Sequence, residues 1–307
     1  MNLYKINKEY SLFLFFFTLL FLTIVSEVLE RKNILVPFQT ITCFFLISII
    51  GVSHGALDHL KGYKIIKFYG IKNKYYFYPI YIFFSLIVII LWKLLPSLTL
   101  FLFLIIASCH FGKEDSSIGS TIKKRFVSLF FFLKGSIVIL APLSFHTDET
   151  IKIFETLNVN LTIPNENFFL ILLILSFLSN FFIMLWAKNG GFFLADWMTI
   201  IILNVSFSPL VAFTIYFCFL HSVRHSFALI YKLNKNDFKN GLKQFIKIAL
   251  PLTLTTGIFF MVSAYFLTNY YVLDHAILKV IFIGLASLTF PHILLEYLLE
   301  KNEKQKN

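Results

Sequence analysis

Charged residues are scarce in this chain, since Asp, Glu, Lys and Arg together make up 14% of its 307 residues. Cysteine is scarcer, with three residues that all lie in apolar runs rather than in paired loops. This placement gives no basis for a disulfide framework, and the sequence has neither a cysteine-rich zinc set nor a haem attachment motif. The absences argue against a disulfide-stabilised scaffold, a structural zinc domain and covalently bound haem.

Apolar side chains are abundant instead: 58% of the residues are hydrophobic, 19% are aromatic, and 40 are Phe. With a mean hydropathy of +0.80, the chain has the composition of a polytopic membrane protein rather than of a soluble domain. Lys and Arg outnumber Asp and Glu by 27 to 16, but they cluster in short loops between apolar runs. Membrane topology and anionic membrane lipid explain such clusters, so no nucleic-acid partner is predicted.

Ten apolar runs predict an all-α membrane helical bundle that forms a single integral-membrane domain over residues 1–307, with a basic tail from about residue 299. No cleavage site follows the first run, which is therefore expected to remain as a span. The positive-inside rule places both termini in the cytoplasm of a multi-pass protein of the cell (inner) membrane. The predicted spans cover approximately residues 10–28, 35–55, 76–95, 97–112, 126–143, 168–187, 192–206, 209–231, 247–268 and 276–298.

Two histidines and an arginine lie inside the eighth apolar run, at His221, Arg224 and His225. Residues i and i+4 of a helix share a face, so the two imidazoles are expected to project side by side, roughly 40° apart. An ionised group within a span costs roughly 2.5 kcal/mol or more, and such groups usually serve a site. The pair predicts half of a metal site, the alternative being a packed polar patch between helices. Arg224 could balance charge near the site or reach lipid phosphate.

Six of the eight histidines fall at one depth, at the cytoplasmic ends of the even-numbered predicted spans. These six are His54, His59, His110, His221, His225 and His292. Neutral imidazoles from four helices at one level suit a buried centre of iron, copper or zinc. The remaining two, His146 and His275, lie beside acidic residues in outward loops and are expected to be solvated.

A carboxylate follows several of these histidines at helical spacing. His54 and Asp58 share a helix face, whereas His54 and His59 lie roughly 140° apart and cannot easily bind one ion together. The same i, i+4 spacing recurs in the pairs His110/Glu114 and His292/Glu296. Metal-bound imidazoles commonly donate their second N–H to a carboxylate, although these carboxylates could equally face the cytoplasm or pair with loop lysines.

All-nitrogen coordination with open positions would suit non-haem iron that reacts with O₂, although the familiar triad of that chemistry has two histidines and one carboxylate. The apolar residues around the histidines predict an apolar substrate that enters from the bilayer. Phe111, Phe217 and Phe290 are candidates for lining its path. The residues alone therefore indicate an integral membrane metalloenzyme that acts with O₂ on a lipid.

Four pieces of the sequence resemble, in order, the Brp/Blh family of microbial β-carotene 15,15′-dioxygenases. They are His54-Gly-Ala-Leu-Asp58-His59, His110-Phe-Gly, His221-Ser-Val-Arg224-His225 and Pro291-His292. The pieces stand at family-like separations, and the resemblance runs from about residue 50 to the last span.

The resemblance implies an Fe(II) enzyme that cleaves the central 15,15′ double bond of all-trans-β-carotene with O₂. The product would be two molecules of retinal, the chromophore of microbial rhodopsins, to which it could be passed. The resemblance implies four iron ligands, namely His54, His110, His221 and His225. His59 and His292 would lie near the centre, as would Asp58, Arg224, Glu114 and Glu296.

Two alternatives remain at this point. A membrane di-iron hydroxylase or desaturase is also rich in histidine, but those families carry adjacent His-His pairs, which this sequence lacks. A metal-binding transporter without enzymatic activity is the other alternative. A translocation path should spread polar groups along the membrane normal, whereas these histidines are predicted to gather at one depth.

Overall fold

The computed structural model describes residues 36–115, 127–161, 167–186 and 191–306, together with a few N-terminal residues (Glu9, Tyr10, Phe13, Leu14, Phe16, Phe17 and Leu20). Within these ranges the chain is all-helical and contains no strand. This is the expected outcome for long apolar runs, because a helix satisfies its own backbone hydrogen bonds and can therefore cross a bilayer.

Seven of the described helices are long and apolar enough to cross a membrane, which identifies a helical membrane protein. They are Phe38–Phe68, Lys74–Leu94, Pro96–Glu114, Ser128–Phe145, Pro209–Leu233, Phe238–Leu267 and Leu273–Asn302. Two shorter apolar helices, Phe168–Phe182 and Leu194–Ser206, match the predicted spans 168–187 and 192–206. The predicted first span lies largely outside the described residues, so ten spans and cytoplasmic termini stay predictions.

Several of the long helices are divided by tighter or wider turns. In chain order the elements are α2 (Val36–Leu46), η1 (Ile47–Gly51), η2 (Val52–Leu57), α3 (Asp58–Phe68), η3 (Lys74–Tyr76), α4 (Phe77–Leu94), α5 (Pro96–Glu114), α6 (Val127–Gly135), α7 (Ile137–Phe145), α8 (Thr147–Thr156), α9 (Phe168–Trp186), α10 (Gly191–Ser206), α11 (Pro209–Ile215), η4 (Tyr216–Ser222), α12 (Val223–Leu233), α13 (Phe238–Leu267) and α14 (Leu273–Lys306). Of the η segments, η1 and η4 are π-helical, and η2 and η3 are 3₁₀ helices.

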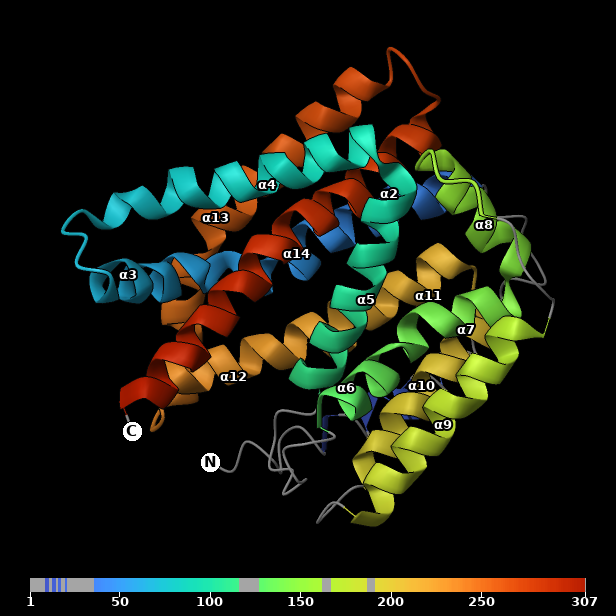
Figure 1. The fold of residues 1–307 in the computed structure, drawn as a ribbon, viewed down its shortest axis with the longest axis horizontal. Coiled ribbons are helices and arrows are strands. Elements are labelled where there is room, and N and C mark those ends of the chain that lie inside the picture. Colours follow the sequence, from blue (N-terminus) through green and yellow to red (C-terminus); the bar gives the residue numbers. More distant parts are fainter. Residues whose placement is uncertain are drawn as a thin grey trace.

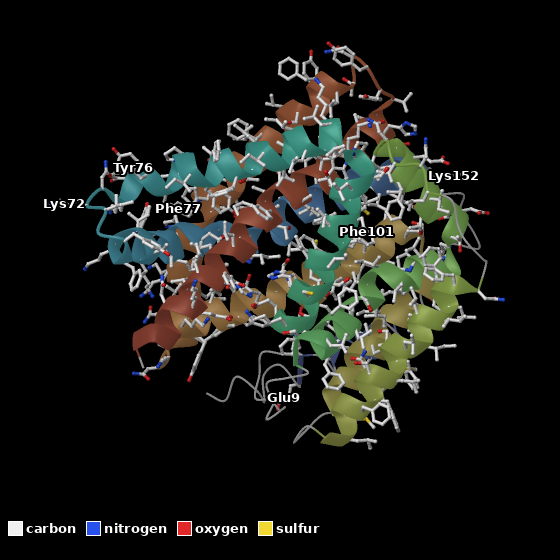
Figure 2. All side chains as sticks on the ribbon, in the orientation of Figure 1. Glu9, Lys72, Tyr76, Phe77, Phe101 and Lys152 are labelled. Atoms are coloured by element: carbon white, nitrogen blue, oxygen red, sulfur yellow. The ribbon has the colours of Figure 1, made fainter. Side chains whose placement is uncertain are left out.

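The helices form two groups that meet at α5 (Figure 1). One group contains α6, α7, α9 and α10, and the other contains α3, α4, α12, α13 and α14. α5 packs most closely on α6, where Gly112 and Gly135 bring the two backbones together: a Cβ atom added at either glycine would overlap backbone atoms of the other helix. This close approach holds the C-terminal end of α5, which carries His110. At the far end of the other group, Lys72 and Tyr76 mark the tip where α3 joins α4 (Figure 2).

The two π-helical segments pack against each other in the interior. The Ser222 hydroxyl of η4 donates to the Gly51 carbonyl oxygen of η1 at 2.9 Å. A Cβ atom added at Gly51 would lie 2.6 Å from the Phe217 ring, so only glycine permits this contact. π-helical turns are rare and often occur at functional sites. The assumption of one uninterrupted α-helix through His221 is therefore wrong.

The structure adds helix outside the predicted spans and corrects one further expectation, that His146 is solvated. The 144–167 connection contains a helix, α8, and the tail beyond residue 299 continues α14 as far as Lys306. An ion pair between Lys113 and Glu300 ties this extension of α14 to the end of α5. His146 is partly buried rather than solvated, because its Nε2 atom lies 2.6 Å from the Asn204 carbonyl oxygen.

Candidate metal centre

Four histidines from four helical segments lie together in the interior of the molecule: His110 on α5, His221 on η4, His225 on α12 and His292 on α14. The ring centroids of His110 and His221 are 5.4 Å apart, and those of His110 and His292 are 5.3 Å apart. His225 lies next to His292, with a centroid distance of 6.2 Å. Imidazoles separated by up to 182 residues in the sequence, from 110 to 292, thus become neighbours.

A carboxylate engages the Nδ1 atom of three of these rings. His221 Nδ1 lies 3.2 Å from Asp115, His225 Nδ1 lies 2.9 Å from Glu114, and His292 Nδ1 lies 2.7 Å from Asp58. A neutral imidazole that donates from Nδ1 carries its lone pair on Nε2, and all three Nε2 atoms are buried. Carboxylates in this position fix the tautomer and orientation of metal-bound imidazoles.

These hydrogen bonds run between helices, whereas the sequence predicts pairing one turn apart within a helix. Glu114 accepts from His225 of α12, and Asp58 is bonded to His292 of α14. Glu296 pairs with Lys61, whose Nζ atom lies 2.7 Å from its carboxylate. The same Glu296 oxygen lies 4.0 Å from His292 Nε2, so this predicted pair does share a face.

A group of buried charged side chains surrounds Asp115, the carboxylate that contacts His221. Arg224 forms two hydrogen bonds with Asp196, at 2.9 and 2.8 Å, and lies 3.8 Å from Asp115. Asp115 also accepts from the Tyr216 hydroxyl at 2.8 Å. The Arg224 side chain is 3% exposed, so the alternative that it reaches lipid phosphate is wrong and the alternative that it balances charge near the site is supported.

The charge of Asp115 follows from its partners. Burial alone would raise the pKa of this carboxyl group, but the hydrogen bond from His221 and the nearby charge of Arg224 lower the pKa well below its usual range. Asp115 therefore acts as an acceptor for His221 Nδ1 and not as a proton donor.

His54 and His59 lie on consecutive helical segments, η2 and α3. His54 lies in η2, but its side chain is outside the described residues, so its predicted role as a ligand stays a prediction. The Nδ1 atom of His59 lies 3.0 Å from the Ala56 carbonyl oxygen, and its ring packs edge-on against Tyr63. The predicted place of His59 near the centre stays a prediction.

Two sets of side chains within the described ranges have ligand atoms close enough to share one ion. One set is His110, His292 and Glu296, the other is Glu114, His225 and Glu296, and within each set the atoms lie within 4.8 Å of one another. Imidazole nitrogen and carboxylate oxygen are the donors that non-haem iron prefers. The donor chemistry and burial of these residues therefore fit a metal site, and iron is among the metals that such donors suit.

An internal cavity of about 400 Å³ borders the histidines. His110, His221 and His292 form part of its wall, and most of the remaining wall is apolar and comes from α4, α13 and α14. Phe111 and Phe217 line it as expected, whereas Phe290 is not among its wall residues.

The cavity reaches the outer surface of the helical bundle. Ile82 and Leu86 of α4 and Phe259 of α13 line the cavity and are also 57%, 50% and 66% exposed. These side chains lie on helices that are long and apolar enough to cross a membrane, so the cavity opens on an apolar face of the helical bundle. A smaller cavity of about 80 Å³ lies behind Phe111 and Phe217, which are wall residues of both cavities.

Four residues of the site escaped the sequence reasoning: Asp115, Asp196, Lys61 and Tyr81. The Tyr81 hydroxyl donates to the Asp58 carboxylate at 3.2 Å. Asp58 therefore has three partners, since it also contacts His292 and Lys61. Asp115 directly follows Glu114 in the sequence. Asp196 is the only acidic residue of its apolar run, and an acidic side chain within a span is a signal that could have found it.

The fold and the site define a helical membrane protein with a buried centre of histidines and carboxylates beside an apolar cavity that opens on the surface of the helical bundle. A family model described as "Beta-carotene 15,15'-dioxygenase" matches residues 45–300. The chain therefore belongs to the β-carotene 15,15′-dioxygenase family, a family of enzymes, and the resemblance noted in the sequence is confirmed. This membership sets aside the alternative of a transporter without enzymatic activity.

One curated relative supports the same assignment. The chain is 28% identical over 263 residues to the β-carotene 15,15′-dioxygenase of Uncultured marine bacterium 66A03, which covers 81% of this chain and 90% of the relative. No solved structure matches the chain.

Proposed function

We propose that this protein cleaves the central 15,15′ double bond of all-trans-β-carotene with O₂ to give two molecules of all-trans-retinal, with Fe(II) as its cofactor. The observation that carries the proposal is the cluster of carboxylate-held histidines in the wall of an apolar cavity that opens on the surface of the helical bundle. The family membership supplies the expected reaction and substrate.

The proposed iron ligands are His54, His110, His221 and His225. Support for the last two comes from Asp115 and Glu114, which hold their Nδ1 atoms and direct the lone pairs to Nε2. His292 is held by Asp58 in the same way, so we propose it as a further candidate ligand. Bound iron would supply the activation of O₂.

The protein would contribute placement rather than acid–base chemistry. A polyene entering between α4 and α13 would lie along the apolar cavity wall, with water excluded and the bond to be cleaved beside His110 and His221. Phe111 and Phe217 separate this space from the smaller cavity behind them. Movement of these two rings would give the second half of a symmetric substrate room beyond the centre.

Removal of the Glu114 carboxylate is expected to weaken the centre. Glu114→Ala should lower iron content and retinal formation by about 10- to 100-fold, because His225 would lose the acceptor that orients its ring. Glu114→Gln should recover part of both, since an amide oxygen still accepts a hydrogen bond. Metal analysis of the purified protein and chromatography of retinal would measure the effect. An unchanged iron content in Glu114→Ala would contradict the role assigned to Glu114.

Expression in a bacterial host that accumulates β-carotene tests the reaction directly. Membranes with the wild-type chain are expected to lose colour and to yield extractable retinal, whereas His225→Ala at matched abundance should yield less than about one hundredth as much. Longer apocarotenals would show that cleavage occurs at another bond. Unchanged β-carotene despite good expression and added iron would refute the proposed substrate, and an iron-free active preparation would refute the proposed cofactor.

The cavity also bears on the partners. Its opening lies on an apolar face of the helical bundle, so both the substrate and the product would be exchanged with the bilayer of the cell membrane. Retinal released there could be taken up by a microbial rhodopsin. Incubation of active membranes with a retinal-free rhodopsin, followed by its visible absorption, would test this transfer.

A further inference from the structure

Thr253 on α13 is an unusual residue of the larger cavity. Its side chain lines the cavity and is 7% exposed, and its hydroxyl oxygen is buried with no hydrogen-bond partner among the described residues. Thr255 and Thr256 of the same wall donate instead to the carbonyl oxygens of Pro251 and Leu252, at 2.8 and 3.0 Å. Threonines within helices commonly bond one turn back in this way. A buried hydroxyl without such a bond points to an absent partner.

Thr253 lies at the level of the histidine centre. α13 and α14 are antiparallel neighbours, and a Cβ atom added at Gly284 would lie 2.7 Å from the Phe260 ring, which sets their register (Figure 1). His292 follows Gly284 by eight residues, 292 minus 284. Leu252 precedes Phe260 by the same eight residues, 260 minus 252, which is a rise of roughly 12 Å on each helix. Thr253, next to Leu252, therefore lies level with His292.

The same part of α13 packs against the segment that carries His54. Ala249, one turn before Thr253, belongs to one buried cluster with Ala56 of η2. A Cβ atom added at Gly55 would lie 3.9 Å from His292 Nδ1, so η2 also adjoins the centre. Thr253 is thus placed at the junction of the apolar cavity and the histidines.

We propose that the Thr253 hydroxyl donates a hydrogen bond to the aldehyde oxygen that cleavage places on retinal. This inference rests on the proposed function. In that reaction one C=C bond breaks, the two oxygen atoms of O₂ end on its two carbon atoms, and two C=O groups form. The new carbonyl group arises beside the histidines, at the level of Thr253. Rotation about the Cα–Cβ bond of Thr253 exchanges its hydroxyl and methyl groups in the cavity wall, so no backbone movement is needed.

Thr253 would discriminate between substrate and product. β-Carotene is a hydrocarbon and offers no acceptor, so its binding gains nothing from the hydroxyl group. An interaction that forms only as oxygen is added favours the reacting species over the bound substrate. Thr253→Val is therefore expected to leave the KM for β-carotene within about twofold of wild type, to lower kcat, and to raise the Kd of retinal by roughly 2- to 12-fold, the range set by one hydrogen bond.

Ligand titrations of the purified full-length chain would test the inference. All-trans-retinal and its hydrocarbon analogue without the carbonyl group would be titrated separately, with tryptophan fluorescence as the readout. Wild type should bind retinal more tightly than the analogue, Thr253→Val should lose that preference, and Thr253→Ser should keep it. Thr199→Val is the matched control, because Thr199 is buried away from the cavity and its hydroxyl bonds to the Ala195 carbonyl oxygen.

The outcomes separate this inference from the proposed function. If Thr253→Val binds retinal as tightly as wild type, the hydrogen bond is refuted, while retinal formation by wild-type membranes would still support β-carotene cleavage. An equal loss of affinity for both ligands would show a packing role and would also overturn the inference. If wild-type membranes form no retinal, the proposed function fails, and the titrations still decide whether Thr253 binds the carbonyl group.

Discussion

Alanine at His110 is expected to reduce retinal formation to less than about one hundredth of the wild-type level, a loss beyond the range seen when residues that only support a ligand are replaced. His110 has ring neighbours on two sides, His221 at 5.4 Å and His292 at 5.3 Å, and it lines the cavity. Its removal would take one imidazole from the middle of the cluster. Chromatography of retinal and iron analysis of the same preparation would measure both consequences.

His275→Ala is the matched control for this variant, because His275 is an exposed histidine in the first turn of α14. It should retain wild-type iron content and retinal formation. Near-wild-type retinal formation by His110→Ala would remove His110 from the centre. A loss of retinal with unchanged iron content would instead assign His110 to substrate placement.

Alanine at Asp196 is expected to lower the free energy of unfolding by about 3–5 kcal/mol, the usual effect of removing one partner of a buried ion pair. Arg224 is 3% exposed and forms two hydrogen bonds with Asp196. Without Asp196, the guanidinium group would remain buried beside Lys134, with Asp115 as the remaining carboxylate close to it. Unfolding the purified protein in detergent with heat or denaturant would measure the loss.

Two comparison variants make this result interpretable. Glu155→Ala changes an exposed carboxylate of α8 and should alter stability by less than about 0.5 kcal/mol. Replacing both partners, Asp196→Ala with Arg224→Met, should recover much of the stability, because no unpaired charge is left buried. If the single variant Asp196→Ala is as stable as wild type, the ion pair does not stabilise the fold.

Helix positions and the identity of the clustered histidines could be predicted because both depend on local patterns. Long apolar runs fix where helices form, since a span must satisfy its own backbone hydrogen bonds. The histidines His110, His221 and His225 stood out because polar groups are rare in such runs. The ordered motifs then led to the family, which the match over residues 45–300 confirmed.

The contacts between helices could not be predicted, because they depend on register and rotation that no local pattern encodes. Glu114 is one turn from His110 in sequence, yet it is bonded to His225 of another helix. The π-helical turns of η1 and η4 break the 3.6-residue period on which the face assignments relied. The partnership of Asp196 with Arg224 likewise requires α10 and α12 to be placed in space.

Because the cavity opens on the side of the helical bundle, the turnover rate is expected to depend on the concentration of carotenoid in the membrane and not on its concentration in the buffer. Ile82, Leu86 and Phe259 are exposed apolar residues at this opening, so a carotenoid is expected to reach the site by lateral diffusion in the bilayer rather than as a solute in water. The relevant variable is then the mole fraction of carotenoid in the bilayer. Dilution of vesicles with buffer should leave the turnover rate unchanged, whereas dilution of the same membranes with added lipid should lower it.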